Sequence, residues 1–263
     1  MPGGAPRNQE TVNEMSGHSK WATIKHKKGA ADKKRGKLFA KLIRQVEVAA
    51  RNGGGDPETN PTLRTMFQKA RDASVPMDTI ERAIKRGTGE LEGVNYESVT
   101  YEGYAPGGVA VYVEALTDNR NRTGAEIRST FTKLGGSLAE PGAVAWQFER
   151  KGVVLVPGSV AEDDLMLAAL DAGAEDISGD GEMWTVTCAA TDTAAVRQAI
   201  EEAGLEVEGS DLTMLPSATV AIDTADAAKG VLRLIDALDD QDDVQDVFAN
   251  FDIPDEVLAA VEG

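Results

Sequence analysis

The order of strand and helix patterns in the second half of the chain limits the fold more than any other feature. From Val153 onwards, short runs in which apolar and polar residues alternate are interspersed with two stretches of helical periodicity. These patterns predict strands over 153–157, 175–178, 183–189 and 205–212, and helices over 162–172 and 193–203. The resulting βαββαβ order is the signature of a ferredoxin-like sandwich. We therefore expect a ferredoxin-like α/β domain over residues 144–214.

The segments on both sides of this domain predict a second α/β domain that is discontinuous in sequence. Before it, two strands joined by an Ala-Pro-Gly-Gly turn are followed by a helix. After it comes a βαβ tail that can complete the earlier ββα piece. The expected elements are strands over 98–104 and 109–116, a helix to about 134, a strand over 219–222, a helix over 227–238 and an extended segment over 244–251. The middle domain would then consist of residues 91–143 and 215–263.

Three helical patterns precede these domains. In the first, apolar side chains recur at the three-and-four spacing of an amphipathic helix. Asn60 followed by Pro61 predicts the start of the second helix. The third is expected to begin at Asp78, where an Asp-x-x-Glu pattern to Glu81 resembles a capping box. Together with the sheets, these helices predict an α+β protein with a small three-helix domain over residues 16–90.

Charge is distributed very unevenly along the chain. Residues 16–51 contain eleven Lys or Arg and two Asp or Glu, whereas residues 91–263 contain nine Lys or Arg and 34 Asp or Glu. A chain with a net charge of −17 that gathers its positive charge at one end repels polyanions with most of its surface and attracts them with one module. This asymmetry predicts nucleic-acid binding by the N-terminal segment. The alternative is that the charge run is only a solvated face.

Two parts of the basic segment differ in character. Residues 20–28 have no apolar period and are predicted to form a flexible basic arm. Trp21 lies among its lysines, where an exposed indole can stack on an unpaired base while the lysines neutralise phosphates; alternatively it is a structural Trp packed against the helices. In the following helix, four cations share a face other than the apolar one, and we expect this face to stay exposed. They are Lys33, Lys37, Lys41 and Arg44.

A second pair of cations lies at the start of a predicted helix. The positive charges of Arg120 and Arg122 lie near the positive end of the helix dipole, which is unfavourable unless an anion is nearby. They are therefore candidates for a secondary phosphate contact. The alternative is that they pair with Asp118 or Glu126 on the protein surface.

An acidic cluster, Asp-Asp-Gln-Asp-Asp over residues 239–243, separates a predicted helix from a predicted strand. The leading interpretation is a solvated loop. Binding of Mg²⁺ or of a basic protein partner is the alternative.

Motifs for metal binding and catalysis are missing. The only two histidines, His18 and His26, lie in the cationic arm, and no Cys pair accompanies them, so we expect neither a metal site nor a cofactor. The chain has no GxSxG, HExxH or Walker lysine. We therefore do not expect an enzyme, although general acid–base chemistry could in principle use carboxylates alone.

Composition favours a cytoplasmic protein. No apolar run approaches the roughly 18 residues needed for a membrane span, and the first residues lack the features of a secretory signal. Residues 1–15 are polar and rich in Pro and Gly, so we expect a disordered extension with Met15 as the functional start. The single cysteine, Cys188, alternates with Trp184 and Val186 on one strand face, which predicts a buried structural thiol.

Several long motifs resemble one family. They are MSGHSKWATIKHKKGAADKKRGKLFAKLIRQVEVAAR from Met15, then PTLRTMFQKARDASVPMDTIERAIKRGTGE, YEGYAPGGVAVYVEALTDNRNRTGAEIR, GAVAWQFERKGVV and the closing IDALDDQDDVQDVFANFDIPDE. In this order they closely resemble the YebC/PmpR family, from Met15 nearly to Glu256. The resemblance implies a helical N-terminal domain and two α/β domains around a cleft. It also implies a DNA-binding transcriptional regulator, related to mitochondrial translational activators of cytochrome oxidase and to bacterial proteins linked with ribosomes paused on proline-rich products.

The resemblance also places the nucleic-acid contacts within motifs that this chain retains. They are Lys20, Trp21, Lys25, His26, Lys27, Lys28, Lys33, Lys34, Lys37, Lys41 and Arg44. We expect a DNA-binding transcriptional regulator, with a ribosome- or mRNA-associated translation factor as the alternative, because phosphate neutralisation serves both. A third hypothesis is an interaction scaffold whose acidic body binds a basic protein.

Overall fold

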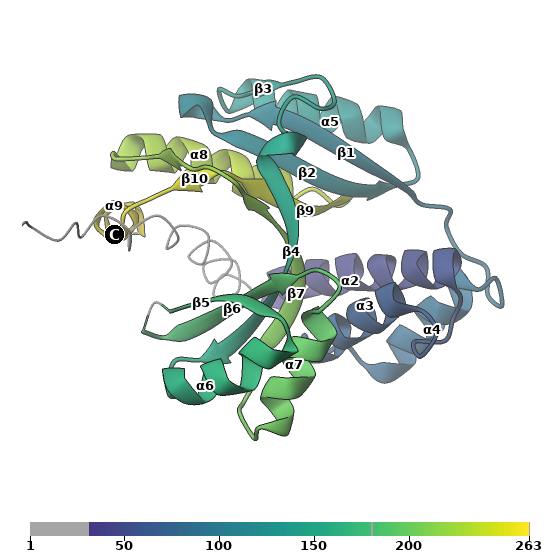
Figure 1. Cartoon of the computed structure of the whole chain (residues 1–263). Helices are drawn as coiled ribbons and strands as arrows, with labels where there is room; N and C mark the ends of the chain where they lie inside the picture. Colours follow the sequence, from purple (N-terminus) through teal and green to yellow (C-terminus); the bar gives the residue numbers. More distant parts are fainter. Residues whose placement is uncertain (1–31, 180, 263) are drawn as a thin grey trace, which may run out of the picture.

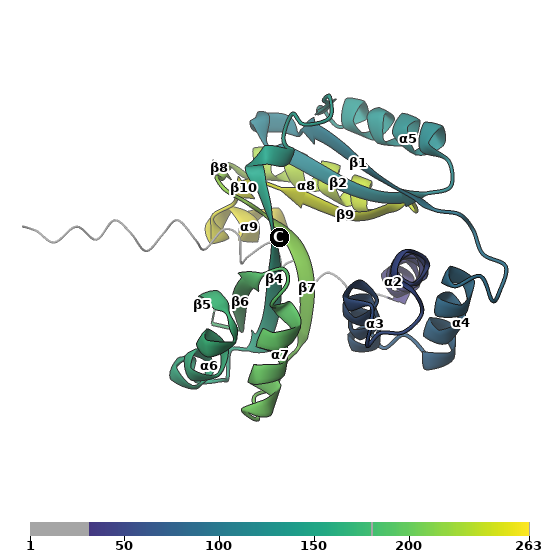
Figure 2. The same cartoon turned by 45° about the vertical axis from the view of Figure 1, so that its right-hand side comes forward.

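The computed structural model describes residues 32–179 and 181–262. Its elements form a helical unit and two larger sheets, each accompanied by helices (Figure 1). The expected α+β class is confirmed. Figure 2 shows the helical unit grouped at one side of both sheets. The cleft implied by the family resemblance stays a prediction.

The helical unit consists of α2 (Asp32–Gly53), α3 (Pro61–Asp72) and α4 (Met77–Gly87). One stripe of each helix faces a common apolar core. Its fully or almost fully buried members are Leu42, Val46, Ala49, Ala50, Leu63, Ala70, Val75, Ile80 and Ala83. The amphipathic pattern expected for the first helix is thus confirmed, because its predicted apolar face supplies the first four of these residues.

The predicted start of α3 is confirmed in detail. Asn60 is the N-cap, and its side-chain oxygen accepts a hydrogen bond of 3.1 Å from the backbone N–H of Leu63. The side-chain amide of Asn60 donates to the carbonyl oxygens of Ala49 and Gly54, at 2.9 and 2.8 Å. Pro61 occupies the first helical position, where a missing N–H costs nothing. This one buried side chain therefore joins the start of α3 to the end of α2.

The predicted capping box of the third helix is wrong. α4 begins at Met77, and Pro76 is the N-cap, so Asp78 lies inside the first turn and makes no capping hydrogen bond. The fixed backbone of Pro76 already directs the chain into the helix, and its carbonyl oxygen accepts from the N–H groups of Thr79 and Ile80 at 3.0 and 3.2 Å. A side-chain cap is not needed at such a start.

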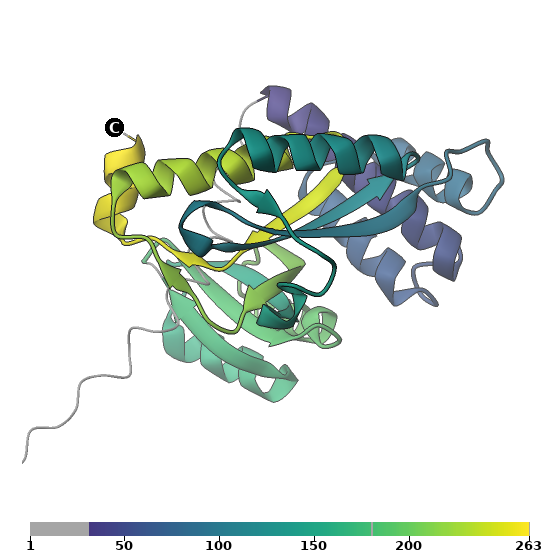
Figure 3. The same cartoon turned by 90° about the horizontal axis from the view of Figure 1, so that it is seen from above.

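The first sheet is antiparallel, in the order β3-β1-β2-β9. Its strands are β1 (Glu97–Tyr104), β2 (Ala110–Thr117), β3 (Ser137–Leu138) and β9 (Val244–Ala249). Two helices, α5 (Arg120–Lys133) and α8 (Ala225–Asp239), lie beside each other over one face of it (Figure 3). Phe131, Leu234 and Val247 meet in the core between them and the sheet. A strand from the C-terminal part of the chain thus completes a sheet that begins at residue 97.

Short elements complete this unit. The turn between β1 and β2 is η1 (Pro106–Gly108), where Gly107 and Gly108 have positive φ of 81° and 78°, a conformation that favours glycine. β8 (Val220–Ala221) and β10 (Phe251–Asp252) form a parallel pair. The last helix, α9 (Asp255–Glu262), was not predicted, and its apolar residues pack against the core of α8.

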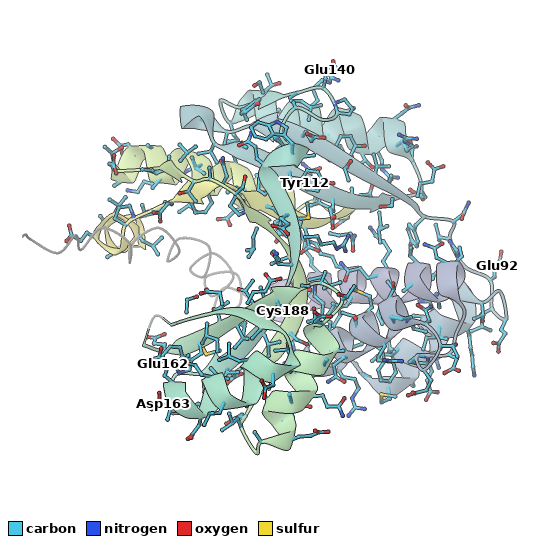
Figure 4. All side chains as sticks on the ribbon, viewed as in Figure 1. Glu92, Tyr112, Glu140, Glu162, Asp163 and Cys188 are labelled. Atoms are coloured by element: carbon cyan, nitrogen blue, oxygen red, sulfur yellow. The ribbon has the colours of Figure 1, made fainter. Side chains whose placement is uncertain are left out.

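The second sheet has the order β5-β6-β4-β7 and is also antiparallel. Its elements along the chain are β4 (Phe148–Pro157), α6 (Glu162–Ala169), η3 (Leu170–Ala172), β5 (Ala174–Gly179), β6 (Met183–Ala189), α7 (Thr193–Glu202) and β7 (Gly209–Pro216). The ferredoxin-like topology is confirmed. Cys188 is buried on β6 (Figure 4), and burial raises the pKa of its thiol. The expectation of a structural thiol therefore agrees with its position.

The sequence also predicts extended backbone over 144–149, before the strand at 153–157. Residues 145–147 instead form a short 3-10 turn, η2 (Ala145–Gln147), whereas Phe148 and Glu149 are extended as the first residues of β4. The buried carboxylate of Glu102 accepts hydrogen bonds from three backbone N–H groups around this turn. They belong to Gly142, Val144 and Ala145, at 2.6, 2.7 and 2.8 Å. Burial alone would raise the pKa of Glu102, but these hydrogen bonds lower it overall. The carboxylate of Glu102 on β1 thus holds residues 142–147 in a turn, although the sequence of this segment favours an extended backbone.

The two sheets meet at the start of β4 and the end of β7, where Phe148 pairs with Pro216 (Figure 1). At this joint Tyr112 lies between Phe148 and Phe248, with ring centroids 6.1 and 6.4 Å away (Figure 4). Since the strands of the second sheet all lie between β3 and β9 in sequence, we propose the division expected above: 16–90, 91–143 plus 215–263, and 144–214.

Candidate nucleic-acid interface

Most of the predicted nucleic-acid contacts lie at or before the first described residue. Lys20, Trp21, Lys25, His26, Lys27 and Lys28 lie outside the described residues, and Lys33 and Lys34 belong to the first turn of α2. Lys37, Lys41 and Arg44 lie further along α2, with described side chains. The geometry of the candidate interface therefore rests on these three cations and on their surroundings.

Lys37 and Lys41 both bind the acidic loop, residues 239–243. The Nζ atom of Lys37 is 2.6 Å from Oδ1 and 2.9 Å from the carbonyl oxygen of Asp240. The Nζ atom of Lys41 is 3.0 Å from Oδ1 and 2.7 Å from the carbonyl oxygen of Asp239. Only 38 % of the Lys37 side chain and 12 % of the Lys41 side chain are exposed. The expectation that this face of α2 points to solvent is therefore wrong for Lys41.

Arg44 extends the same contact by one further turn. Its Nη1 donates to the carbonyl oxygens of Leu116 and Asp242, at 3.1 and 2.7 Å, and lies 3.4 Å from Oδ1 of Asp243. The guanidinium also lies over the ring of Tyr96, 4.9 Å from its centroid. Arg44 is thus bound by backbone, carboxylate and aromatic groups at once.

The acidic loop attracts cations for a second reason, because it follows the C-terminus of α8. The last carbonyl groups of a helix have no partner within the helix and carry the negative end of its dipole. α8 has no basic residue in its last turn, and Lys37 and Lys41 from α2 supply the missing cations by binding the carbonyl oxygens of Asp240 and Asp239. The lysine stripe and the acidic cluster, which lie far apart in the sequence, are therefore each other's partners.

Asp243 joins α2 to the start of α5. Its Oδ2 accepts hydrogen bonds from Thr117, Thr123 and Arg122, at 3.1, 2.6 and 2.7 Å, while its Oδ1 faces Arg44. Burial would raise the pKa of Asp243, but the bonds from Thr123, Arg122 and Thr117 lower it below its ordinary value. This carboxylate is therefore ionised, and both of its oxygens have partners inside the fold.

The two arginines predicted as a secondary phosphate contact differ. Nη2 of Arg122 is 2.9 Å from Oδ1 of Asp118 and 2.7 Å from Oδ2 of Asp243, so two carboxylates share its charge. Nη1 of Arg120 is 3.9 Å from Oε2 of Glu97, and both side chains are mostly exposed. An exposed pair at this distance contributes little. A phosphate contact stays a prediction for both, and Arg120 is the more accessible of the two.

The helical unit also contacts the ferredoxin-like sheet through ion pairs. On α3, Asp72 accepts two hydrogen bonds from Arg197 of α7, at 2.6 and 3.2 Å. Lys69 of α3 lies 2.7 Å from Asp211 of β7. α2 is thus held by the acidic loop after α8, and α3 by charged groups of α7 and β7, which fixes the orientation of the helical unit.

Other kinds of site receive no support from the described residues. Within residues 32–179 and 181–262, no three His, Cys, Asp or Glu side chains are placed to hold a metal ion. In the same part of the chain, no helix has the length and apolar character to cross a bilayer. Both histidines lie outside it.

Comparison with known proteins gives the family. Residues 19–90 match the family described as the TACO1/YebC protein N-terminal domain, and residues 96–251 match the TACO1/YebC second and third domain. The chain belongs to the TACO1/YebC family. A relative from Rubrobacter xylanophilus is 61 % identical over 251 residues, which cover 95 % of this chain and all of the relative. A relative from Beutenbergia cavernae is 57 % identical, covering 94 % of this chain and 99 % of the relative.

Both of these TACO1/YebC relatives carry the name "Probable transcriptional regulatory protein". A solved structure, of a conserved hypothetical protein from Aquifex aeolicus, has a TM-score of 0.82 and 49 % sequence identity, covering 91 % of this chain and 99 % of that chain. The resemblance to the YebC family found in the sequence is thereby confirmed, together with the α+β fold class.

Proposed function

We propose that this TACO1/YebC protein is a non-enzymatic regulator that binds nucleic acid through the basic segment leading into α2, with DNA and transcriptional control as the leading assignment. The names of its relatives support a regulatory role. The observation that carries the proposal is the density of cations in the sequence before Lys37, next to described cations that are already bound within the fold. From Lys37 onwards, the stripe on α2 is bound to the acidic loop. Residues 20–35 before it contain seven Lys or Arg and one acid, Asp32.

This division assigns different tasks to the two halves of the predicted site. The cations of residues 20–35 would neutralise phosphates, with Trp21 available for stacking on an unpaired base. Lys37, Lys41 and Arg44 would mainly hold α2 on the acidic loop, and would reach a phosphate only by exchanging an acceptor they already have. A regulator of this kind acts in the cytoplasm, needs no cofactor and binds its target more weakly as salt rises.

One observation favours the alternative, a translation factor that binds ribosomal or messenger RNA. A helix that reads duplex DNA presents its polar face to the major groove, but the face of α2 that carries Lys37, Lys41 and Arg44 is covered by the acidic loop. Binding through a basic segment that precedes a helix suits single strands and RNA loops as well as duplexes.

The test uses a variant in which Lys20, Lys25, Lys27, Lys28, Lys33 and Lys34 are replaced by Gln, called the arm-neutral variant. Its matched control carries Arg at the same six positions. Fluorescence anisotropy with labelled duplex DNA, single-stranded DNA and single-stranded RNA of one sequence should give a log–log salt slope of roughly −4 to −6 for the parent protein and the control, because five to seven phosphates are neutralised. The arm-neutral variant should lose most of this binding.

The outcome separates the assignments. Unchanged binding by the arm-neutral variant would overturn the proposal. Loss of binding, with duplex DNA bound at least as tightly as RNA in the parent protein, supports the leading assignment. If the parent protein binds single-stranded RNA at least tenfold more tightly than duplex DNA, the assignment to transcriptional control is replaced by the assignment to a translation factor.

A further inference from the structure

A groove on the outside of the first sheet gathers cations that the folded core does not use. It lies between α5 and the strands β1 and β3, and its cavity volume is about 680 Å³. Its lining includes the ring of Tyr101, the cations Arg120, Arg128 and Lys133, and the polar groups of Asn121 and Ser129. Among the described residues, Arg128 and Lys133 have no carboxylate within ion-pair distance of their charged groups, and both are exposed.

This concentration of charge contrasts with the rest of the body. α5 contains four Lys or Arg and one acid, Glu126. The other residues between 91 and 263 contain five Lys or Arg and 33 Asp or Glu. Cations spread at random over such a surface would find carboxylates close by, as Lys151 does with Glu149 and Glu175. The groove is therefore a local positive surface on a strongly negative body, and it attracts anions.

The spacing of the cations indicates what kind of anion fits. An α-helix rises 1.5 Å per residue, so Arg120 and Lys133 lie about 20 Å apart along α5, with Arg128 between them. One phosphate cannot bridge that distance. Successive phosphates of an extended strand can contact the three cations in turn, as in grooves that follow the backbone of single-stranded nucleic acid.

Tyr101 supplies the second half of such a site. Its hydroxyl donates to the carbonyl oxygen of Arg120 at 3.4 Å, which holds the ring beside the start of α5. The helix residue that faces the ring is Gly124, and a Cβ atom there would lie 3.5 Å from the ring and hydroxyl of Tyr101. Glycine inside a helix is unfavourable relative to alanine. Here it leaves the ring open to the groove, where a base can stack.

We propose that this groove is a second nucleic-acid site, which binds a short stretch of single strand by stacking one base on Tyr101 and contacting phosphates with Arg120, Arg128 and Lys133. It is separate from the basic segment before α2 and does not depend on that segment's role. It lies on the opposite side of the first sheet from α2, with Asp243 linking Arg44 on α2 to Arg122 at the start of α5.

The first experiment measures single-strand binding by the full chain after Arg128→Gln and Lys133→Gln. We expect about a fivefold or greater loss of affinity for a labelled 15-nucleotide strand, and a salt slope that is less steep by roughly 1.4, because two phosphate contacts are removed from a single strand. The matched control is Lys229→Gln with Arg233→Gln on the neighbouring helix α8, which removes the same charge away from the groove. Equal effects of the two double variants would overturn the proposal.

The second variant is Gly124→Leu, whose side chain would cover the ring of Tyr101 while improving the helix propensity of α5. Affinity should fall about fivefold or more with little change in salt slope, since base stacking on an aromatic ring does not release counterions. Gly124→Ala is its control, because a single methyl group lies at ordinary contact distance from the ring. A Leu variant that binds as tightly as the Ala variant would refute the stacking contact.

Two further measurements distinguish the groove from the basic segment and from a pocket for free nucleotides. The arm-neutral variant should keep a residual single-strand binding, which should disappear when Arg128→Gln and Lys133→Gln are added. If the arm-neutral variant has no residual binding, the proposal of a site in the groove is overturned, whereas the proposed role of the basic segment is not affected. ATP and AMP should compete at least a hundredfold more weakly than the strand. Competition by ATP at the strand's own affinity would assign the groove to free nucleotides and overturn the proposal.

Discussion

Removing the carboxylates that bind α2 should strengthen nucleic-acid binding. In the variant Asp239→Asn with Asp240→Asn, Lys37 and Lys41 lose their carboxylate partners but keep the carbonyl oxygens of the same two residues as acceptors. The lysines then become available to phosphates without a competing negative charge. If the acidic loop and the nucleic acid compete for these cations, affinity rises.

The size of the effect follows from exposure. The side chains of Asp239 and Asp240 are 46 % and 72 % exposed, and exposed ion pairs contribute about 0.2–1 kcal/mol each. Two such pairs amount to about 1 kcal/mol, or roughly a fivefold gain in affinity. Two additional phosphate contacts should also make the log–log salt slope steeper by roughly 2.

Fluorescence anisotropy with a labelled oligonucleotide over a range of salt concentrations measures both quantities. The control is Glu162→Gln with Asp163→Asn on α6, which changes the net charge equally at two exposed positions far from α2 (Figure 4). If the two double variants gain affinity equally, the effect is one of net charge, and direct competition for Lys37 and Lys41 is refuted.

Two predictions concern stability. Asp243→Asn should lower the free energy of unfolding by about 2–3 kcal/mol, since it weakens charge-assisted hydrogen bonds to a buried acceptor. Folding lowers the pKa of Asp243, so its contribution to stability is present above the unfolded pKa, near 4, and is lost as pH falls through the folded value. In urea unfolding, the parent protein should therefore lose this part of its stability at low pH. The Asn variant should not show this pH-dependent loss. Asn60→Ala should lower stability by about 1–3 kcal/mol, by removing the cap of α3 and leaving the carbonyl oxygens of Ala49 and Gly54 without their donor. A loss below about 0.5 kcal/mol in thermal or urea unfolding would contradict this role.

Local signals in the sequence were sufficient for much of the fold. The change from helical to alternating periodicity gave the two sheet-containing units, and the Asn60-Pro61 pair gave the start of α3. Errors arose where a distant group, or the backbone itself, decides local structure in place of a side-chain pattern. The turn before β4 depends on Glu102, some 40 residues earlier in the chain, and the start of α4 depends on the backbone of Pro76 rather than on a polar cap.

The candidate site was harder to predict for the same reason. Lys37 and Asp240 are 203 positions apart in the sequence, and no local pattern shows which acidic segment faces which basic helix. Spacing did reveal the cationic stripe, but not that its C-terminal half is covered. One signal was available: α8 ends without a basic residue in its last turn, so the cations that stabilise its C-terminus had to come from elsewhere.

The position of β9 has a consequence for protein synthesis. β2 has β1 on one side, but its other edge stays unpaired until Val244–Ala249 leaves the ribosome, whereas every strand of the ferredoxin-like sheet is available once Pro216 has emerged. The ferredoxin-like sheet can therefore form first, although it comes later in the sequence. Until β9 is synthesised, the first sheet has an unpaired edge on β2 that can pair with other chains. During that interval the acidic loop does not yet exist, and Lys37, Lys41 and Arg44 of the growing chain have none of its oxygens to bind.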